Sequence, residues 1–188
     1  MVIDILKTRW SPLSFANKPV EEDRLKTIFE AAGLAPSSRN EQPWMFIFST
    51  RKTPGKFNDF LNFLDESNRV WAKSAGVIII SMTRTKYSSI DRVNRYAFHD
   101  TGMAEINMIL QAISMDIYVH QMGGFSREKV KEYFNLDENV EPVTMMALGY
   151  LGDGSELNDE LRKRHFKRKT RKNINEYIFR NDLYTPAF

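Results

Sequence analysis

Two pairs of polar residues near opposite ends of the chain could bind an anion. Arg9 and Ser11 place a guanidinium group and a hydroxyl group close together, and Lys169 and Arg171 flank a threonine. In an extended segment alternate residues point the same way, so Lys169 and Arg171 would face one side. Arginine can bind phosphate through two parallel hydrogen bonds, so the two pairs together could hold one phosphate. Solvated surface charges would show the same spacing, and that interpretation stays open.

A polar loop from Pro36 to Trp44 could recognise the edge of a heterocycle. Its sequence, Pro-Ser-Ser-Arg-Asn-Glu-Gln-Pro-Trp, places hydroxyls, amides and a guanidinium between two prolines. It leads directly into a hydrophobic segment, which would hold these groups on a rigid scaffold. Serine and asparagine also satisfy their own backbone in ordinary turns, so a purely structural turn is the alternative.

The segment Gln121-Met122-Gly123-Gly124-Phe125 is a third candidate. Two consecutive glycines let the backbone approach a flat ligand closely and expose its N–H donors. A simple connecting turn would have the same sequence.

Several kinds of site are excluded by what the sequence lacks. The three histidines, His99, His120 and His165, lie in unrelated contexts without metal-ligand spacing, and the chain has no cysteine. There is no Gly-x-Ser-x-Gly elbow, no Gly-x-x-x-x-Gly-Lys phosphate loop and no glycine fingerprint of a Rossmann fold. Hydrolase, kinase and thiol chemistry are therefore disfavoured, and a nicotinamide cofactor would not be held in the Rossmann manner.

The gross features are those of a globular protein of one domain, residues 1–188. No apolar stretch follows the N-terminal basic residues, and no window reaches the roughly 20 apolar residues of a membrane span, so we expect a cytoplasmic protein. The net charge is only +3, but residues 162–172 contain eight lysines or arginines. Such a run implies an anionic partner. As an alternative it could be a nucleic-acid arm, with Phe166 stacking on bases and binding weakened by salt.

Hydrophobic periodicity places these motifs on helices, strands and loops. We expect a short helix before Arg9, helices over 24–33 and 127–134, and a helix that presents Phe57, Phe60, Leu61 and Leu64 on one face. Ser126 should cap the helix over 127–134. Strands are expected over 44–48, 75–80 and 144–150, the second of them covered on both faces.

A long helix over residues 102–116 is predicted to be apolar almost all round. Such a helix must be buried on most sides, in a central core or against another subunit. Helices and strands alternate without a strict βαβ rhythm, which favours an α+β protein with helices packed around a central, mostly antiparallel sheet.

Taken in order, these segments resemble the FMN-dependent nitroreductase family over nearly the whole chain. The resemblance rests on Arg9-x-Ser11, on Pro36-Ser37-Ser38-x-Asn40-x-Gln42-Pro43-Trp44 before a strand, and on Asp100-x-Gly102 opening the apolar helix. A Gly-Gly-Phe turn, a strand ending Leu148-Gly149-Tyr150 and a late Lys169-x-Arg171 complete it. The segment from Pro36 to Trp44 is the most specific part of the resemblance.

The resemblance implies a homodimer with FMN between the subunits. In that arrangement Arg9, Trp10 and Ser11 would hold the phosphate and ribityl end of FMN together with Lys169 and Arg171. The partner subunit would supply Pro36, Ser37, Ser38 and Asn40. The flavin ring would be lined by Gln121, Met122, Gly123 and Gly124, with Asn68 as the candidate for its pyrimidine edge. The helix over 102–116 would form the dimer core, and residues near 176–180 would cross to the other subunit.

Two residues depart from the family pattern. Leu13 stands where the family often has a basic residue, and Trp10 stands where a polar or basic residue is usual. Both changes bear on how tightly the phosphate is held.

The implied activity takes hydride from NAD(P)H and reduces a nitroaromatic, a quinone or a similar small acceptor in two half-reactions. No side chain is assigned as an essential acid or base. Two alternatives remain: a non-enzymatic flavin-binding or sensing protein, and a dehalogenating or flavin-fragmenting relative in which residues 82–97 would act as a lid.

Overall fold

The computed structural model describes residues 1–188 and is built on a four-stranded sheet. The strand order is β1-β2-β4-β3, and every neighbouring pair is antiparallel. The strands are β1 (Trp44–Thr50), β2 (Val77–Arg84), β3 (Ile117–Met122) and β4 (Val140–Tyr150). The predicted α+β class with a central antiparallel sheet is therefore confirmed.

The two central strands are buried on both faces, as predicted for the β-branched run. Residues 77–80 of β2 have no exposed surface, and neither have residues 145–148 of β4. β-branched side chains suit this position because they pack well on a pleated surface covered from both sides.

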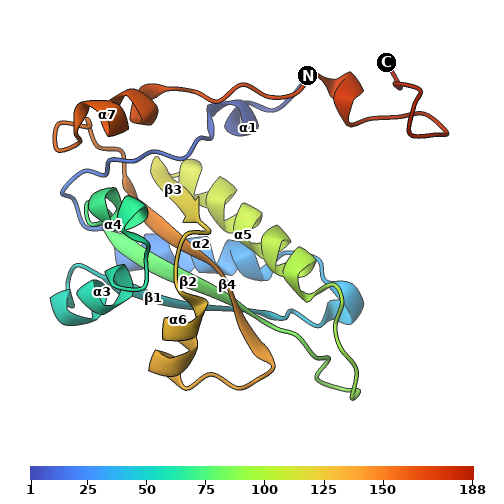
Figure 1. Ribbon diagram of the computed structural model, residues 1–188, viewed down its shortest axis with the longest axis horizontal. Helices are drawn as coiled ribbons and strands as arrows, with labels where there is room; N and C mark the ends of the chain where they lie inside the picture. Colours follow the sequence, from blue (N-terminus) through green and yellow to red (C-terminus); the bar gives the residue numbers. More distant parts are fainter.

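Helices cover both faces of the sheet (Figure 1). One face carries α2 (Glu22–Gly33) and α5 (Ala97–Ile113), which pack against each other and share a core with the sheet. Side chains from α3 (Pro54–Leu61), α4 (Glu66–Ala72) and α6 (Arg127–Phe134) pack into a second core on the other face. β3 lies at one edge of the sheet and pairs only with β4, which leaves its other edge free.

The helix α5 is more one-sided than its sequence predicts. Ala104, Met108 and Ala112 are fully buried against α2 and the sheet, whereas Phe98 and Ile106 are 52% and 38% exposed. The apolar residues of the second side are thus not covered within one chain. The helix begins at Ala97, earlier than predicted, and ends at Ile113. It cannot extend to the predicted residue 116, because Asp116 adopts a left-handed φ of 57°.

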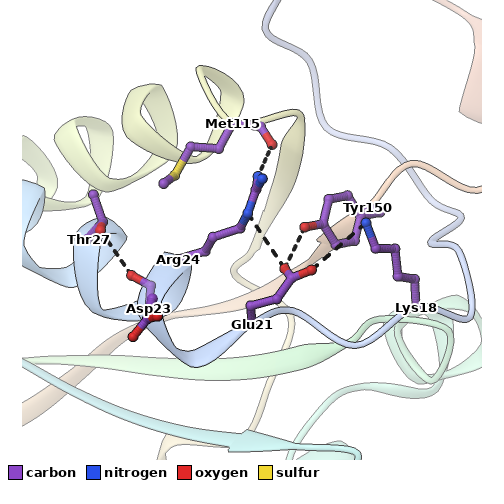
Figure 2. A network of polar contacts seen from close by, with 7 residues as sticks. All are labelled: Lys18, Glu21, Asp23, Arg24, Thr27, Met115 and Tyr150. Carbon is purple, nitrogen blue, oxygen red and sulfur yellow. Dashed lines mark hydrogen bonds and ion pairs between the residues drawn. The ribbon is translucent and has the colours of Figure 1, made fainter.

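A polar network joins the start of α2 to the ends of α5 and β4 (Figure 2). The Tyr150 hydroxyl donates to a carboxylate oxygen of Glu21 at 2.6 Å, and Arg24 donates to the carbonyl oxygen of Met115 at 3.0 Å. The ammonium group of Lys18 lies 3.7 Å from the centre of the Tyr150 ring. These contacts fix α2 against the layer it covers.

Of the other local predictions, one is confirmed and others need small corrections. Ser126 caps α6 as expected, accepting from the Lys129 N–H at 3.2 Å. The helix around Phe57 ends at Leu61, and Leu64 is buried just beyond it rather than on its face. One strand and two α-helices had not been predicted: β3, α4 and α7 (Asp159–Phe166).

The two ends of the chain lie on the same side of the molecule. α1 (Asp4–Thr8) lies beside the C-terminal segment, which leaves α7 and runs past it in Figure 1. Residues 167–188 are almost entirely exposed and contain only a short 3-10 helix, η2 (Ile174–Glu176). None of the helices combines the length and the apolar character needed to cross a membrane.

Candidate functional site

A basic cavity of about 260 Å³ lies where the two ends of the chain meet. Its lining contains five cationic side chains and no carboxylate. The N-terminal segment and the C-terminal segment both contribute, which agrees with the interpretation that the two basic pairs hold one phosphate. The lining residues are Arg9, Trp10, Ser11, Leu13, His120, Arg164, Lys167, Lys169 and Arg171.

Backbone contacts hold the two ends together. The Leu13 N–H donates to Nδ1 of the buried His165 at 3.0 Å, which docks α7 on the N-terminal segment. The N–H groups of Ala16 and Gly152 pair with the carbonyl oxygens of Tyr150 and Ser14 at 2.9 and 3.1 Å. Arg168 donates to the carbonyl oxygen of Thr8 at 3.0 Å. The cavity is therefore formed by tertiary contacts and not by local chain geometry.

The cavity has the electrostatics of an anion site. Burial and the nearby charges of Arg171 and Arg168 lower the pKa of the Arg9 guanidinium, so the protonated form is held among like charges. The guanidinium of Arg168 lies 3.6 Å from the centre of the Trp10 ring, and the buried indole N–H of Trp10 has no hydrogen-bond partner. A cluster of like charges is costly, and so is a buried donor without an acceptor. Both features favour an anionic ligand with acceptor oxygens.

The edge strand β3 leads away from this cavity. His120 lines the cavity, its Nδ1 bonds to the carbonyl oxygen of Pro12 at 2.8 Å, and its ring stacks on Trp71 at 4.5 Å between centres. Burial lowers the pKa of His120, which favours the neutral ring. Because the carbonyl only accepts, Nδ1 must be the protonated nitrogen.

The glycine turn follows directly at the end of β3. The carbonyl oxygen of Gly124 accepts from the N–H of Asp65 and from the side-chain amide of Asn68, each at 3.1 Å. A Cβ atom on Gly124 would lie 2.7 Å from an Asp65 carboxylate oxygen, whereas one on Gly123 would meet nothing within 4 Å. The structure thus brings Asn68 to the glycine turn and leaves the surface over Gly123 open.

The two residues before the turn point in opposite directions. Met122 is buried in the core and can offer a ligand on the free edge only its backbone. Gln121 is exposed, and its side-chain amide donates to Glu105 on α5 at 2.5 Å. Glu105 itself is only 3% exposed, and it also accepts from the hydroxyls of Ser81 and Thr144.

The polar loop of residues 36–43 lies apart from the basic cavity and contributes nothing to its lining. The Ser38 N–H donates to Asp100 at 2.9 Å, and the Ser38 hydroxyl bonds to that of Tyr87 at 3.0 Å. The Ser37 hydroxyl accepts from the Gln42 N–H at 3.0 Å, while Pro36 and Asn40 remain exposed. Positive φ angles at Arg39, Asn40 and Gln42, between 50° and 57°, make this an unusually strained loop.

Four residues of the site region were not predicted from the sequence. Two of them, Arg164 and Lys167, belong to the basic run and line the cavity together with Lys169 and Arg171 of the same run. Four basic residues of the run thus face the cavity, which leaves fewer for a nucleic-acid arm. Leu13 is a core residue at 3% exposure, and Arg164 and Lys167 bring cationic groups to the cavity that it lines. His120 and Glu105 were missed as well. A carboxylate set among apolar residues, in Met103-Ala104-Glu105-Ile106, was the available signal for Glu105.

The sequence between residues 6 and 150 matches the model of the nitroreductase family. A protein of Methanothermobacter thermautotrophicus, named as a candidate NADH dehydrogenase/NAD(P)H nitroreductase, is 26% identical over 164 residues, covering 84% of this chain and 81% of its own. A crystal structure of an oxidoreductase containing FMN superposes with a TM-score of 0.92 at 28% identity, covering 98% of this chain and 94% of the other. A nitroreductase family protein from Streptococcus pneumoniae TIGR4 has the same fold, with a TM-score of 0.77 at 20% identity and coverage of 95% and 98%.

Proposed function

This chain belongs to the nitroreductase family, and on that premise we propose that it is an FMN-dependent oxidoreductase. It would oxidise NAD(P)H and reduce small acceptors such as nitroaromatics or quinones. One observation carries the proposal: cationic groups from both chain ends line a single cavity beside the edge strand β3, which contributes His120.

The basic cavity suits the FMN phosphate. Arg9, Lys169 and Arg171 would hold it, assisted by Arg164 and Lys167 in place of a basic residue at Leu13. The unpartnered indole N–H of Trp10 is available as a further donor, and the Ser11 hydroxyl would be another. Hydrogen bonds between charged partners are roughly twice as strong as neutral ones, which favours tight retention of a dianionic phosphate.

The free edge of β3 and the glycine turn suit the flavin ring. Gln121, Gly123 and Gly124 would line it, with the backbone of Met122, while Asn68 holds the turn through the Gly124 carbonyl. When bound, FMN would supply the two-electron redox chemistry. The protein's part is to orient the cofactor and leave the surface over Gly123 open, so that NAD(P)H and the acceptor could occupy one place in turn.

A homodimer would complete the site. The strained loop carrying Pro36, Ser37, Ser38 and Asn40 is held rigid by Asp100 and Tyr87 but lies apart from its own chain's cavity, so it would serve the partner subunit. The uncovered apolar side of α5, with Phe98 and Ile106, would lie in the interface, and the exposed C-terminal segment would cross it. All 188 residues would then act as one domain.

The test is to identify the flavin and then to time NAD(P)H oxidation. The purified protein should be yellow, with FMN released on denaturation at about one per chain, and it should oxidise NAD(P)H faster when a quinone or nitroaromatic is added. A colourless protein that takes up no FMN would contradict the proposal. Tight FMN binding without turnover at saturating NAD(P)H would instead identify a flavin-binding protein without enzymatic activity.

A further inference from the structure

Glu105 is a buried acid that the proposed reaction does not use. It projects from α5 onto the sheet, where its carboxylate meets one side chain from each of three strands. Ser81 of β2 and Thr144 of β4 bond to Oε1, the latter at 2.8 Å, and Gln121 of β3 bonds to Oε2 at 2.5 Å. Its partners are neutral, and no charged group contributes to the rise in its pKa, which burial causes and these three hydrogen bonds oppose.

The backbone sets the direction of these hydrogen bonds. The Thr144 N–H donates to the Ser81 Oγ at 3.2 Å, so the Ser81 hydroxyl has its own proton free for Glu105. The Thr144 hydroxyl and the Gln121 amide complete a set of three donors around one carboxylate. An ionised carboxylate only accepts, and it is stable in a buried site when several donors converge on it.

This arrangement fixes the orientation of the Gln121 side chain. While Glu105 is ionised, the NH₂ group of Gln121 must face it, since the amide oxygen would meet another acceptor there. The amide oxygen has no partner within the protein, and the residue is exposed at the end of β3, just before the glycine turn.

We propose that Glu105 is a positioning residue that holds the Gln121 amide with its oxygen towards the bound cofactor. The site would then offer an acceptor to an N–H or O–H donor of that cofactor, and an amide in the opposite orientation would repel the same group. This inference rests on the proposed function, because it assumes that the cofactor lies along the end of β3.

Two variants weaken the hold of Glu105 on the Gln121 amide to different degrees. Glu105→Met deletes the acceptor, after which Ser81 and Thr144, 3.1 Å apart, can bond to each other. Glu105→Gln keeps the shape and one acceptor but also permits the reversed amide. The control is Thr101→Val on the same helix, which removes a buried hydrogen bond to Thr83 of 2.9 Å without touching Gln121.

The first measurement needs no cofactor. In ¹⁵N-labelled apoprotein the side-chain amide signals of Gln121, identified by their absence in Gln121→Met, should exchange slowly with solvent in the wild type and in Thr101→Val. Exchange should be faster in Glu105→Gln and fastest in Glu105→Met. In the wild type itself, these signals should titrate together with the Glu105 carboxyl ¹³C signal. Equal exchange in all four proteins would overturn the coupling between Glu105 and Gln121. The absence of a shared titration in the wild type would overturn it too, and that test does not depend on whether any variant folds.

The second measurement concerns the cofactor. Loss of one oriented acceptor should weaken FMN binding about three- to tenfold in Glu105→Met, with Glu105→Gln between it and the wild type, and Thr101→Val unchanged. Equal affinities for Glu105→Met and Thr101→Val would show that Glu105 does not act through the cofactor site. If neither the wild type nor any variant binds FMN, the proposed function fails. The amide exchange alone then decides whether Glu105 orients Gln121.

Discussion

The basic cavity and the Glu105 pocket are opposites in how their charge is balanced. Five cations surround the cavity without a carboxylate among its lining residues, whereas the Glu105 carboxylate is enclosed by three neutral donors without a cation. The cavity's charges have no internal partner, so its electrostatics favour a ligand from outside. The buried carboxylate already accepts three hydrogen bonds from the protein, so its effect is to orient those neighbours. The balance of donors and acceptors thus separates a binding site from a positioning site.

The strongest way to break this comparison is to remove the unbalanced charge. The double variant Lys169→Ala, Arg171→Ala should weaken FMN binding about a hundredfold or more, because hydrogen bonds to charged groups contribute about 1.5–3 kcal/mol each. Its stability should hardly change, since both side chains are exposed and Arg171 bonds only to adjacent backbone oxygens. FMN titration by fluorescence quenching measures the affinity.

Lys172→Ala with Lys163→Ala is the matched control. These lysines belong to the same basic run but do not line the cavity. If the control loses as much affinity as the double variant, the binding is a diffuse effect of net charge and not a property of the cavity.

The glycine turn that follows β3 offers a sharper, smaller test. Gly124→Ala should destabilise the protein by about 0.5–1.5 kcal/mol, because its Cβ would displace the ends of the Asp65 and Asn68 side chains, at 2.7 and 2.8 Å, and with them the hydrogen bond from Asn68 to the Gly124 carbonyl oxygen. Gly123→Ala, one position earlier, should leave the free energy of unfolding nearly unchanged but place a methyl group on the open surface above β3.

Urea unfolding and FMN titration of both variants separate the two effects. Gly124→Ala should lose stability, and Gly123→Ala should lose cofactor affinity. If Gly123→Ala binds FMN as the wild type does, the ligand does not approach this part of the backbone.

The smallest expected effect concerns pH. Burial raises the pKa of Glu105 above its ordinary value of 4.5, so between that value and the raised one the folded state binds more protons than the unfolded state. The contribution of Glu105 to the free energy of unfolding should therefore fall as the pH rises through this window and then level off. Glu105→Gln should lack that slope.

Urea unfolding of the two proteins at a series of pH values above 4.5 provides the measurement. Parallel curves for the wild type and Glu105→Gln would mean that Glu105 has the same pKa in both states.

Sequence reasoning succeeded where the pattern was local. The β-branched run of β2 and the cap at Ser126 were predictable because strand burial and capping depend on near neighbours. The extended Lys169-x-Arg171 pattern likewise indicated a pair on one side. The meeting of that pair with Arg9 required the resemblance to a family, since no spacing along the chain implies it.

The missed features depend on tertiary packing. Arg164 and Lys167 look like solvated charges until the bond between His165 and Leu13 docks α7. Glu105 looks like an intrusion in an apolar helix until three strands supply its donors. β3 alternates apolar and polar residues, a signal that was present in the sequence and was overlooked. The loop at Ser38 lies apart from the cavity of its own chain. If a second chain completes the site, the place of the loop depends on how two chains pack, which no pattern along one chain predicts.

The docking of α7 by His165 places a protease-sensitive tract directly beside the cavity. Residues 162–172 hold eight potential trypsin sites, and four of those side chains line the cavity. A ligand that bridges Arg9 to Lys169 and Arg171 would fasten both termini to the body of the protein, so opening of the tail would require its release. The rate at which trypsin trims this tail would then report cofactor occupancy directly, without any redox assay.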